Sequence, residues 1–564
     1  HDGRPHRIEV TSSVELALLD PRADVAHPAF GKLFVETEWL PQWHALVCRR
    51  RPRSAAQAPV WAVHVVAADD PEGATDYDTD RAAFLGRRHG PDAPAGLAAP
   101  LGRTVGAVLD PCFALRRTAV VPAGGSVTLA FATAVTRTRE DAVALADHYH
   151  SPTAAGRTFD LAWAHSRVEL RHLGVTAAES HVFQRLLGHV VFPFHHLRCR
   201  PSVRDNRLSQ AALWRFGVSG DVPIVAVCVA DGDGLPLAKQ ALKAHAFWRG
   251  RGYAADLILI ADRPASYREE LTDDLAALVR ASDGRDWLDK PGGVFVRKAQ
   301  PGSEDRAVLL AFARVVLYGD RGSLADQTDA VDRRRVLPPP LAAARAGEPE
   351  VPPSAPVPDL RFANGVGGFA PDGREYVITG VPPAPWANVI ASPAAGCLAT
   401  DAGLGCTWVG NSQAARLTPW HNDPVADPPA EVVYLRDEDT GAFWSVTPSP
   451  GRGCASAVRH RPGSTTYTGE RDGLAVEMTA FVAPADPVKV ILLRVANRRT
   501  DRRRLSATFF AEWVLGTTRE TTAPFAVTAV DPASGALLAR CAFDPDAGPG
   551  VAFADTNLRP RTVT

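Results

Sequence analysis

Strand-like runs recur through the first 135 residues. IEVTSSVELALL (8–19) largely alternates apolar and polar residues, with the two-residue period of a half-buried β-strand, and VWAVHVVAA (60–68) and SVTLAFATAV (126–135) are further strand-like runs. Pro and Gly interrupt the segments between them. We therefore predict that residues 1–135 form a β-sandwich region, with residues 80–110 as a surface loop.

The period lengthens to that of an α-helix over residues 136–220, which we predict to be a helical connector. Thr138 and Thr176 each begin a T-x-x-D/E sequence of the kind that caps a helix N-terminus. Two apolar stripes follow these caps, and both are predicted to be packing faces. They consist of Phe159, Trp163, Leu170 and Leu173, and of Val182, Phe183, Leu186, Leu187 and Val190.

Strand-like and helix-like runs then alternate over residues 221–330. IVAVCV (224–229), ADLILIAD (255–262) and GGVFVRKA (292–299) are continuous apolar strands, each followed by a helical segment, the last being SEDRAVLLAFARVVL (303–317). This order predicts a small α/β unit with a parallel sheet. A nucleotide could bind at its strand ends. The first turn, ADGDGLPLA, lacks the glycine spacing of the common nucleotide motifs, which favours a structural spacer.

A Pro-rich linker is predicted over residues 331–356, and a second β-sandwich over residues 357–564. Parts of the first region recur in the second at similar spacing, which indicates an internal repeat. The recurring residues are Arg7, Ile8, Thr11, Glu15 and Leu18, matched by Arg504, Leu505, Thr508, Glu512 and Leu515, and Ala45, Leu46, Val47 and Arg49, matched by Ala536, Leu537, Leu538 and Arg540.

The predicted fold is therefore a multidomain α+β chain. Two sandwich regions are separated by helices and the α/β unit. The first residue is His and the only Met is Met478. We expect a piece of a longer polypeptide in which both sandwiches are truncated, the first at its N-terminus and the second at its C-terminus.

One segment, TWVGNSQAARLTPWHNDPVADPPAEVVYLR (407–436), combines Trp rings with amide, carboxylate and guanidinium groups. Its prolines exclude a helix, so we predict a long ordered loop between two strands. Aromatic faces beside such polar groups suit a sugar, while a self-packed loop that closes a sandwich is the alternative. The candidate substrate-binding or interface residues are Trp408, Asn411, Arg416, Trp420, Asn422 and Asp423, with Asp423 as the expected ion-pair partner of Arg416.

Composition narrows the function classes. The formal net charge is -1 among 564 residues, so no basic surface favours nucleic acid or an anionic membrane. The eight cysteines form no C-x-x-C pair, which argues against a metal site and fits a reducing compartment. No apolar run approaches the length of a membrane span. We therefore predict neither a metal nor a membrane segment in this chain.

Several longer segments resemble the sandwich region of glycoside hydrolase family 94, in particular its 1,2-β-glucan branch of cyclic glucan synthases and oligoglucan phosphorylases. These segments include HPAFGKLFVETEWLP (27–41), TDRAAFLGR (79–87), RTVGAVLDPCFALRR (103–117), NGVGGFAPDGREYVI (364–378) and the whole of 383–429. The resemblance covers essentially the whole chain.

The resemblance implies a carbohydrate-active parent enzyme. Family members break or make β-glucosidic bonds with inversion, using phosphate or glucose 1-phosphate as substrate and no organic cofactor. Their catalytic acid lies in an (α/α)6 barrel after the sandwich, so it implies no catalytic residue here. The implied partner is β-1,2-glucan or an oligosaccharide, with a homodimer expected, and the implied location is cytoplasmic, whether or not the parent is anchored to the inner membrane elsewhere. A stand-alone carbohydrate-binding or scaffold protein is the alternative function.

Overall fold

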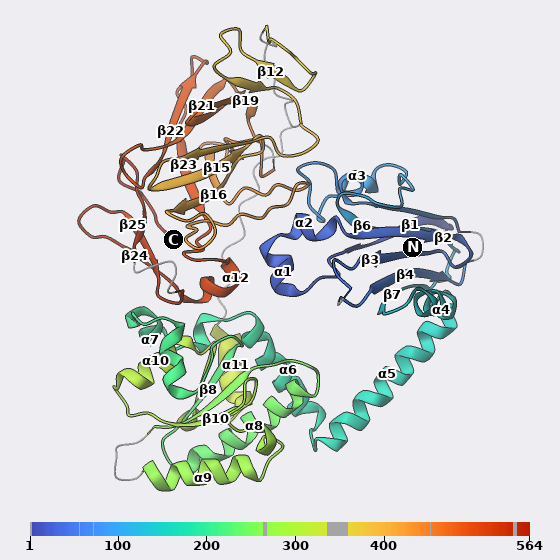
Figure 1. Ribbon diagram of the computed structural model, residues 1–564, viewed down its shortest axis with the longest axis vertical. Helices are drawn as coiled ribbons and strands as arrows, with labels where there is room; N and C mark the ends of the chain where they lie inside the picture. Colours follow the sequence, from blue (N-terminus) through green and yellow to red (C-terminus); the bar gives the residue numbers. More distant parts are fainter. Residues whose placement is uncertain are drawn as a thin grey trace.

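The computed structural model describes residues 3–55, 57–70, 73–262, 268–334, 359–451, 453–544 and 550–564. Figure 1 shows three bodies: a blue sandwich, a green α/β unit and an orange sandwich. Most of the linker predicted over residues 331–356 lies outside the described residues.

The first sandwich consists of two antiparallel sheets that enclose an apolar core. One sheet has the order β1-β6-β5 and the other β2-β3-β4-β7. Leu46 and Cys48 of one sheet pack against Phe113 and Leu115 of the other. The strands are β1 (His6–Glu15), β2 (Val35–Leu40), β3 (Ala45–Arg50), β4 (Val60–Ala68), β5 (Thr75–Asp80), β6 (Pro111–Val121) and β7 (Leu129–Thr136). The helices are α1 (Pro21–Ala26), α2 (Pro28–Lys32) and α3 (Arg81–Leu85).

The region predicted as a surface loop, residues 80–110, is partly buried instead. It contains α3, in which Arg81, Phe84 and Leu85 are buried. The Asp80 carboxylate caps α3 by accepting hydrogen bonds from Ala82 N and Ala83 N. This segment faces the second sandwich (Figure 1), a contact that no local pattern reveals.

A helical connector leads away from the first sandwich. It contains α4 (Arg139–Tyr149), α5 (Pro152–His172), α6 (Ala177–Val191) and α7 (Arg200–Asp205). Both predicted caps are present, since Thr138 accepts from Asp141 N and Thr176 forms a full capping box with Glu179. The prediction of a packing face on α5 was wrong for its first half: Phe159 is 75% and Trp163 is 61% exposed. In Figure 1, α5 spans the distance between two bodies, and Leu170 and Leu173 at its C-terminal end pack against the core of the α/β unit.

The α/β unit has a four-stranded parallel sheet of order β10-β9-β8-β11. Its elements are β8 (Ile224–Val229), α8 (Leu235–Arg249), β9 (Asp256–Ala261), α9 (Arg268–Arg280), β10 (Val294–Lys298), α10 (Glu304–Phe312), β11 (Val315–Tyr318) and α11 (Leu324–Arg334). The end of the predicted last helix is therefore the strand β11. Its β-branched valines pair with β8 and are buried.

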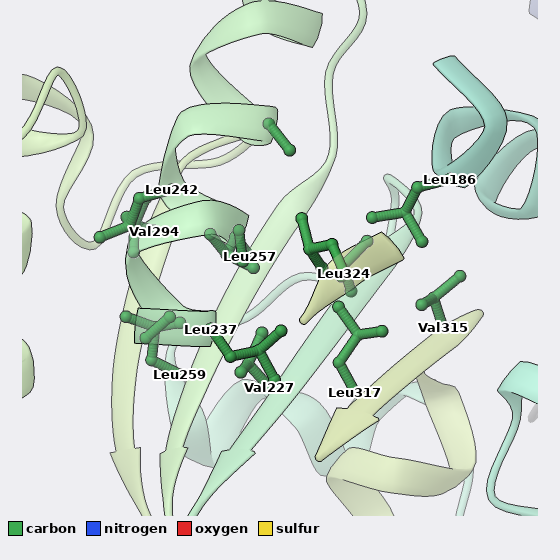
Figure 2. Close-up of a cluster of buried hydrophobic side chains, with 14 of the residues drawn as sticks. Leu186, Val227, Leu237, Leu242, Leu257, Leu259, Val294, Val315, Leu317 and Leu324 are labelled. Carbon is green, nitrogen blue, oxygen red and sulfur yellow. The ribbon is translucent and has the colours of Figure 1, made fainter. Parts of the chain in front are cut away.

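One face of this sheet forms the apolar core in Figure 2, where leucines and valines of the strands meet α8 and α6. The crevice where a ligand would bind such a sheet, between β8 and β11, is closed by backbone. A Cβ atom on Gly319 would lie 2.9 Å from the Cα atom of Gly234. This contact supports the structural role predicted for the unit.

The second sandwich packs two larger antiparallel sheets around Tyr467, Met478, Leu435 and Trp444. One sheet has β12 (Gly367–Phe369), β13 (Tyr376–Ile378), β19 (Ala455–Arg461), β20 (Ser464–Arg471), β21 (Leu474–Val482) and β22 (Lys489–Asn497). The other has β14 (Ala387–Ala391), β15 (Ala395–Thr400), β16 (Leu404–Val409), β17 (Glu431–Asp437), β18 (Phe443–Ser445) and β23 (Leu505–Ala511). A small third sheet follows α12 (Arg519–Thr522), with β24 (Ala526–Val530), β25 (Leu537–Cys541) and β26 (Ala552–Ala554).

The internal repeat has a structural counterpart. Strand β23 matches β1, and β25 matches β3. The repeated Leu18 and Leu515 both adopt the left-handed conformation, with φ of 48° and 55°. This conformation is uncommon for leucine, so its occurrence at both equivalent positions supports the repeat.

Candidate functional site

The segment singled out in the sequence is a loop, residues 410–430, that connects β16 to β17. Gly410 opens it with φ of 67°. The Asn411 side chain then accepts hydrogen bonds from Gln413 N (2.8 Å) and Ala414 N (3.0 Å). Asn411 therefore shapes the first turn of the loop.

Trp408 lies at the end of β16 and belongs to the sheet. A Cβ atom added to Gly396 on the neighbouring strand β15 would lie 2.2 Å from its ring. The Trp408 indole therefore packs over Gly396, where any larger residue would collide with it. This contact gives Trp408 a structural role.

Arg416 is held by backbone groups rather than by a carboxylate. Its Nε donates to Ser412 O (2.9 Å) and its Nη1 to Thr517 O (3.3 Å). Its guanidinium lies 5.9 Å from the Trp420 ring centroid, in a cation–π contact. The predicted ion pair with Asp423 is wrong, because the loop turns at Asn422 (φ 47°) and directs Asp423 towards the first sandwich.

Asp423 instead forms a two-point ion pair with Arg81 of α3. Both carboxylate oxygens accept hydrogen bonds of 2.8 Å from the guanidinium. Asp423 also accepts from Val425 N and Ala426 N. Burial alone would raise the pKa of Asp423, but the hydrogen bonds and charge of Arg81 lower it to about 2. The carboxylate is therefore committed to Arg81 and to its own turn.

Two further arginines of the first sandwich extend this contact. Arg87 Nη2 lies 2.9 Å from Asp427 and 3.2 Å from Asp401, and Arg88 Nη2 lies 2.6 Å from Asp401. Burial raises the pKa of Asp427, although Arg87 opposes the shift. The Asp401 side chain is fully buried, so its charge depends on these two guanidinium groups.

An apolar contact completes the interface. Val425 is 3% exposed and packs in a cluster made otherwise of first-sandwich side chains. They are Phe84, Leu85, Leu101, Cys112 and Ala114. The backbone N–H of Arg88 also donates to Val425 O at 2.8 Å. The contact between the sandwiches thus contains ion pairs, a backbone hydrogen bond and a buried side chain, which together we call the loop anchor.

The base of the loop rests on a buried polar cluster. Thr407 and Thr418 donate to Glu431, at 2.5 and 2.7 Å, and Lys489 forms an ion pair with the same carboxylate. Burial lowers the pKa of Lys489 to about 8. Since Glu431 is 1% exposed, this cluster fixes the ends of the loop.

The six sequence-predicted residues therefore do not form one pocket. Asn411, Trp408 and Asp423 have structural contacts, and Asn422 supplies the turn. Trp420, 39% exposed beside Arg416, remains able to meet a ligand. The sequence reasoning missed Arg81, Arg87 and Arg88, although the basic RAAFLGRR segment complements the acidic DPVAD segment in charge.

Among the described residues, no group of three or more His, Cys, Asp or Glu side chains is arranged to hold a metal ion. In the same part of the chain, no helix is both long and apolar enough to cross a bilayer.

Comparisons with known proteins identify relatives. The glycosyl hydrolase 94 supersandwich domain matches residues 1–152 and 374–564. The cyclic beta-(1,2)-glucan synthase NdvB of Rhizobium meliloti (strain 1021) is 33% identical over 572 aligned residues, covering 95% of this chain and 20% of the synthase. The N,N'-diacetylchitobiose phosphorylases of Vibrio furnissii and Vibrio proteolyticus are 29% and 28% identical over 26% of this chain and 19% of theirs. The chain thus spans about a fifth of the length of these relatives.

Proposed function

Because this chain belongs to glycosyl hydrolase family 94, we propose that it is the non-catalytic sandwich region of an enzyme acting on β-1,2-glucan. The observation that carries the proposal is the extent of the match to the cyclic glucan synthase, which covers 95% of the chain. The phosphorylases of diacetylchitobiose match only 26%. A β-1,2-linked glucan is therefore favoured over a chitobiose as the substrate of the parent.

The parent would transfer glucosyl groups with inversion, as a cyclic glucan synthase or an oligoglucan phosphorylase. The loop carboxylates of this chain do not suit acid catalysis, because each is held by a cation. Asp423 pairs with Arg81, Asp427 with Arg87, and Glu431 with Lys489. A general acid needs a proton at working pH, and the pKa of Asp423 is about 2. Asp423 and Asp427 hold the surface of the first sandwich instead, and Glu431 holds the base of the loop.

We assign the sugar contact to Trp420 with Arg416, because the ring is exposed and the guanidinium lies over it. A pyranose can stack on the part of the ring that the guanidinium leaves uncovered, while the guanidinium donates to its hydroxyls. A cytoplasmic location is part of the proposal and is supported by the free cysteines of the described residues. A homodimer is also part of the proposal.

Two measurements on the purified chain test the proposal. With β-1,2-glucan and inorganic phosphate, no glucose 1-phosphate should form, and robust phosphorolysis would refute the non-catalytic role. Linear β-1,2-gluco-oligosaccharides should bind in a calorimetric titration, and Trp420→Ala should weaken this binding about tenfold, a loss of about 1.4 kcal/mol. Trp163→Ala, which removes a more exposed indole from α5, is the matched control and should bind normally.

A further inference from the structure

We propose that the first sandwich positions the sugar-contacting stretch of the second, with Arg81 as the positioning residue. The inference rests on the proposed function for its sugar readout. Arg81 and Asp423 are separated by 342 residues in sequence, so the loop acquires its conformation from a body distant in the chain.

The stretch that carries Trp420 is short and is held at both ends. On one side, Leu417 N donates to Thr407 O (2.7 Å) and Thr418 donates to Glu431. On the other side, Asp423 is held by Arg81. Only residues 419–422 lie between these points, and Pro419 restricts their backbone further. The position of the indole is therefore determined by where each end is fixed.

The second sandwich supplies the first fixed end, and the first sandwich supplies the other. Arg81 is itself rigid, because it is 4% exposed and also binds Asp110 (3.0 Å) and Glu15 (2.7 Å). A guanidinium can hold these three carboxylates in a planar fork, which an ammonium cannot. Loss of the fork releases Asp423 and allows residues 419–422 to move.

A role of Arg81 in positioning the loop can be distinguished by experiment from a role in stability alone. Loss of one partner of a buried ion pair lowers stability, whereas positioning also predicts a change at Trp420 in the folded protein. The matched control is Arg306→Gln in the α/β unit. Arg306 forms a similar two-point pair with Asp262, at 2.9 and 2.8 Å, but takes no part in the loop anchor.

The experiment uses the full chain labelled with 5-fluorotryptophan. The chain has 12 tryptophans, so the fluorine resonance of Trp420 is assigned with Trp420→Phe. Arg81→Gln should shift or broaden this resonance in the free protein and weaken binding of β-1,2-gluco-oligosaccharides about tenfold. Arg306→Gln should leave both unchanged. Val425→Ala, which loosens the anchor without removing a charge, should move the resonance in the same direction as Arg81→Gln.

An unchanged Trp420 resonance in both folded anchor variants would overturn the proposal. Normal sugar affinity in Arg81→Gln would also overturn it, provided that the unaltered chain binds sugar. If the unaltered chain binds none of these oligosaccharides, the proposed function fails, while the resonance of Trp420 still decides whether Arg81 positions the loop. Should Arg81→Gln not fold, Val425→Ala alone supplies this test.

Discussion

Asp256 provides a pH-dependent stability that can be worked out from its surroundings. The residue begins β9 and is completely buried. One carboxylate oxygen accepts a hydrogen bond from Gly292 N (2.7 Å), whereas the other has no partner among the described residues. Burial, reinforced by the charge of Asp221, raises its pKa from 3.8 to about 6. The charged form is therefore costly in the folded state.

The sign and size of the pH effect on stability follow from the linkage between proton binding and folding. A carboxyl whose pKa is higher in the folded state contributes stability below its unfolded pKa and loses it as pH rises. For Asp256 this loss should occur between about pH 4 and 6 and amount to about 3 kcal/mol, at about 1.4 kcal/mol for each pKa unit. Asp256→Asn keeps an oxygen for Gly292 N and removes the charge. At pH 7 the variant should therefore be more stable than the unaltered chain by about 1–3 kcal/mol.

Hydrogen exchange of the peptide that contains β9 measures this difference locally, which matters because a multidomain chain does not unfold in one step. The unaltered chain and the variant are compared at equal pH, so that the intrinsic exchange rates cancel. Protection should differ at pH 7 and converge near pH 4. Asp233→Asn, an exposed change in the same unit, is the control. Equal protection from exchange in the unaltered chain and in Asp256→Asn at pH 7 would refute the argument that the buried charge lowers stability.

Three other predictions follow from the structure. The effect of pH on stability has the opposite sign at Asp423, whose pKa is about 2. The stability that this carboxylate contributes should be lost as pH falls from about 4 to 2. Asp423→Asn should remove this pH dependence from melting curves recorded in acid. Glu431→Gln leaves Lys489 buried without a carboxylate and should cost about 3–5 kcal/mol in the local opening free energy measured by hydrogen exchange of the peptide that contains β17, whereas the exposed Glu477→Gln should cost almost nothing. Trp163→Gln on α5 should change stability by no more than about 0.5 kcal/mol, and a loss of several kcal/mol would show that the ring is buried in solution.

Local patterns predicted most strands and helices of this chain, because periodicity reports which face of an element is apolar. They predicted the caps at Thr138 and Thr176 for the same local reason. They did not show whether an apolar face has a partner. Phe159 and Trp163 follow a helical period yet are exposed, since this half of α5 spans the distance between two bodies, whereas Leu170 and Leu173 at its end pack against the α/β core.

The candidate loop was recognisable from its composition, but its contacts were not. Arg416 and Asp423 lie seven residues apart and have opposite charges, so a local pair was the natural expectation. The structure pairs Asp423 with Arg81 because the loop reverses at Asn422 and because Arg81 offers both nitrogens at 2.8 Å. Such a choice is made by the packing of whole domains, which single-sequence patterns do not encode.

The chemistry of the loop anchor bears on how two related sandwiches assemble correctly. Their repeated strands share apolar patterns, and domains of similar sequence are prone to misassembly. Apolar burial at Val425 alone would discriminate weakly, because many surfaces accept a valine. The paired guanidinium and carboxylate groups discriminate strongly, because a misplaced carboxylate such as Asp401 would be buried without a cation. The anchor therefore favours one arrangement of the two sandwiches, and the same contacts that select this arrangement hold Trp420 in place.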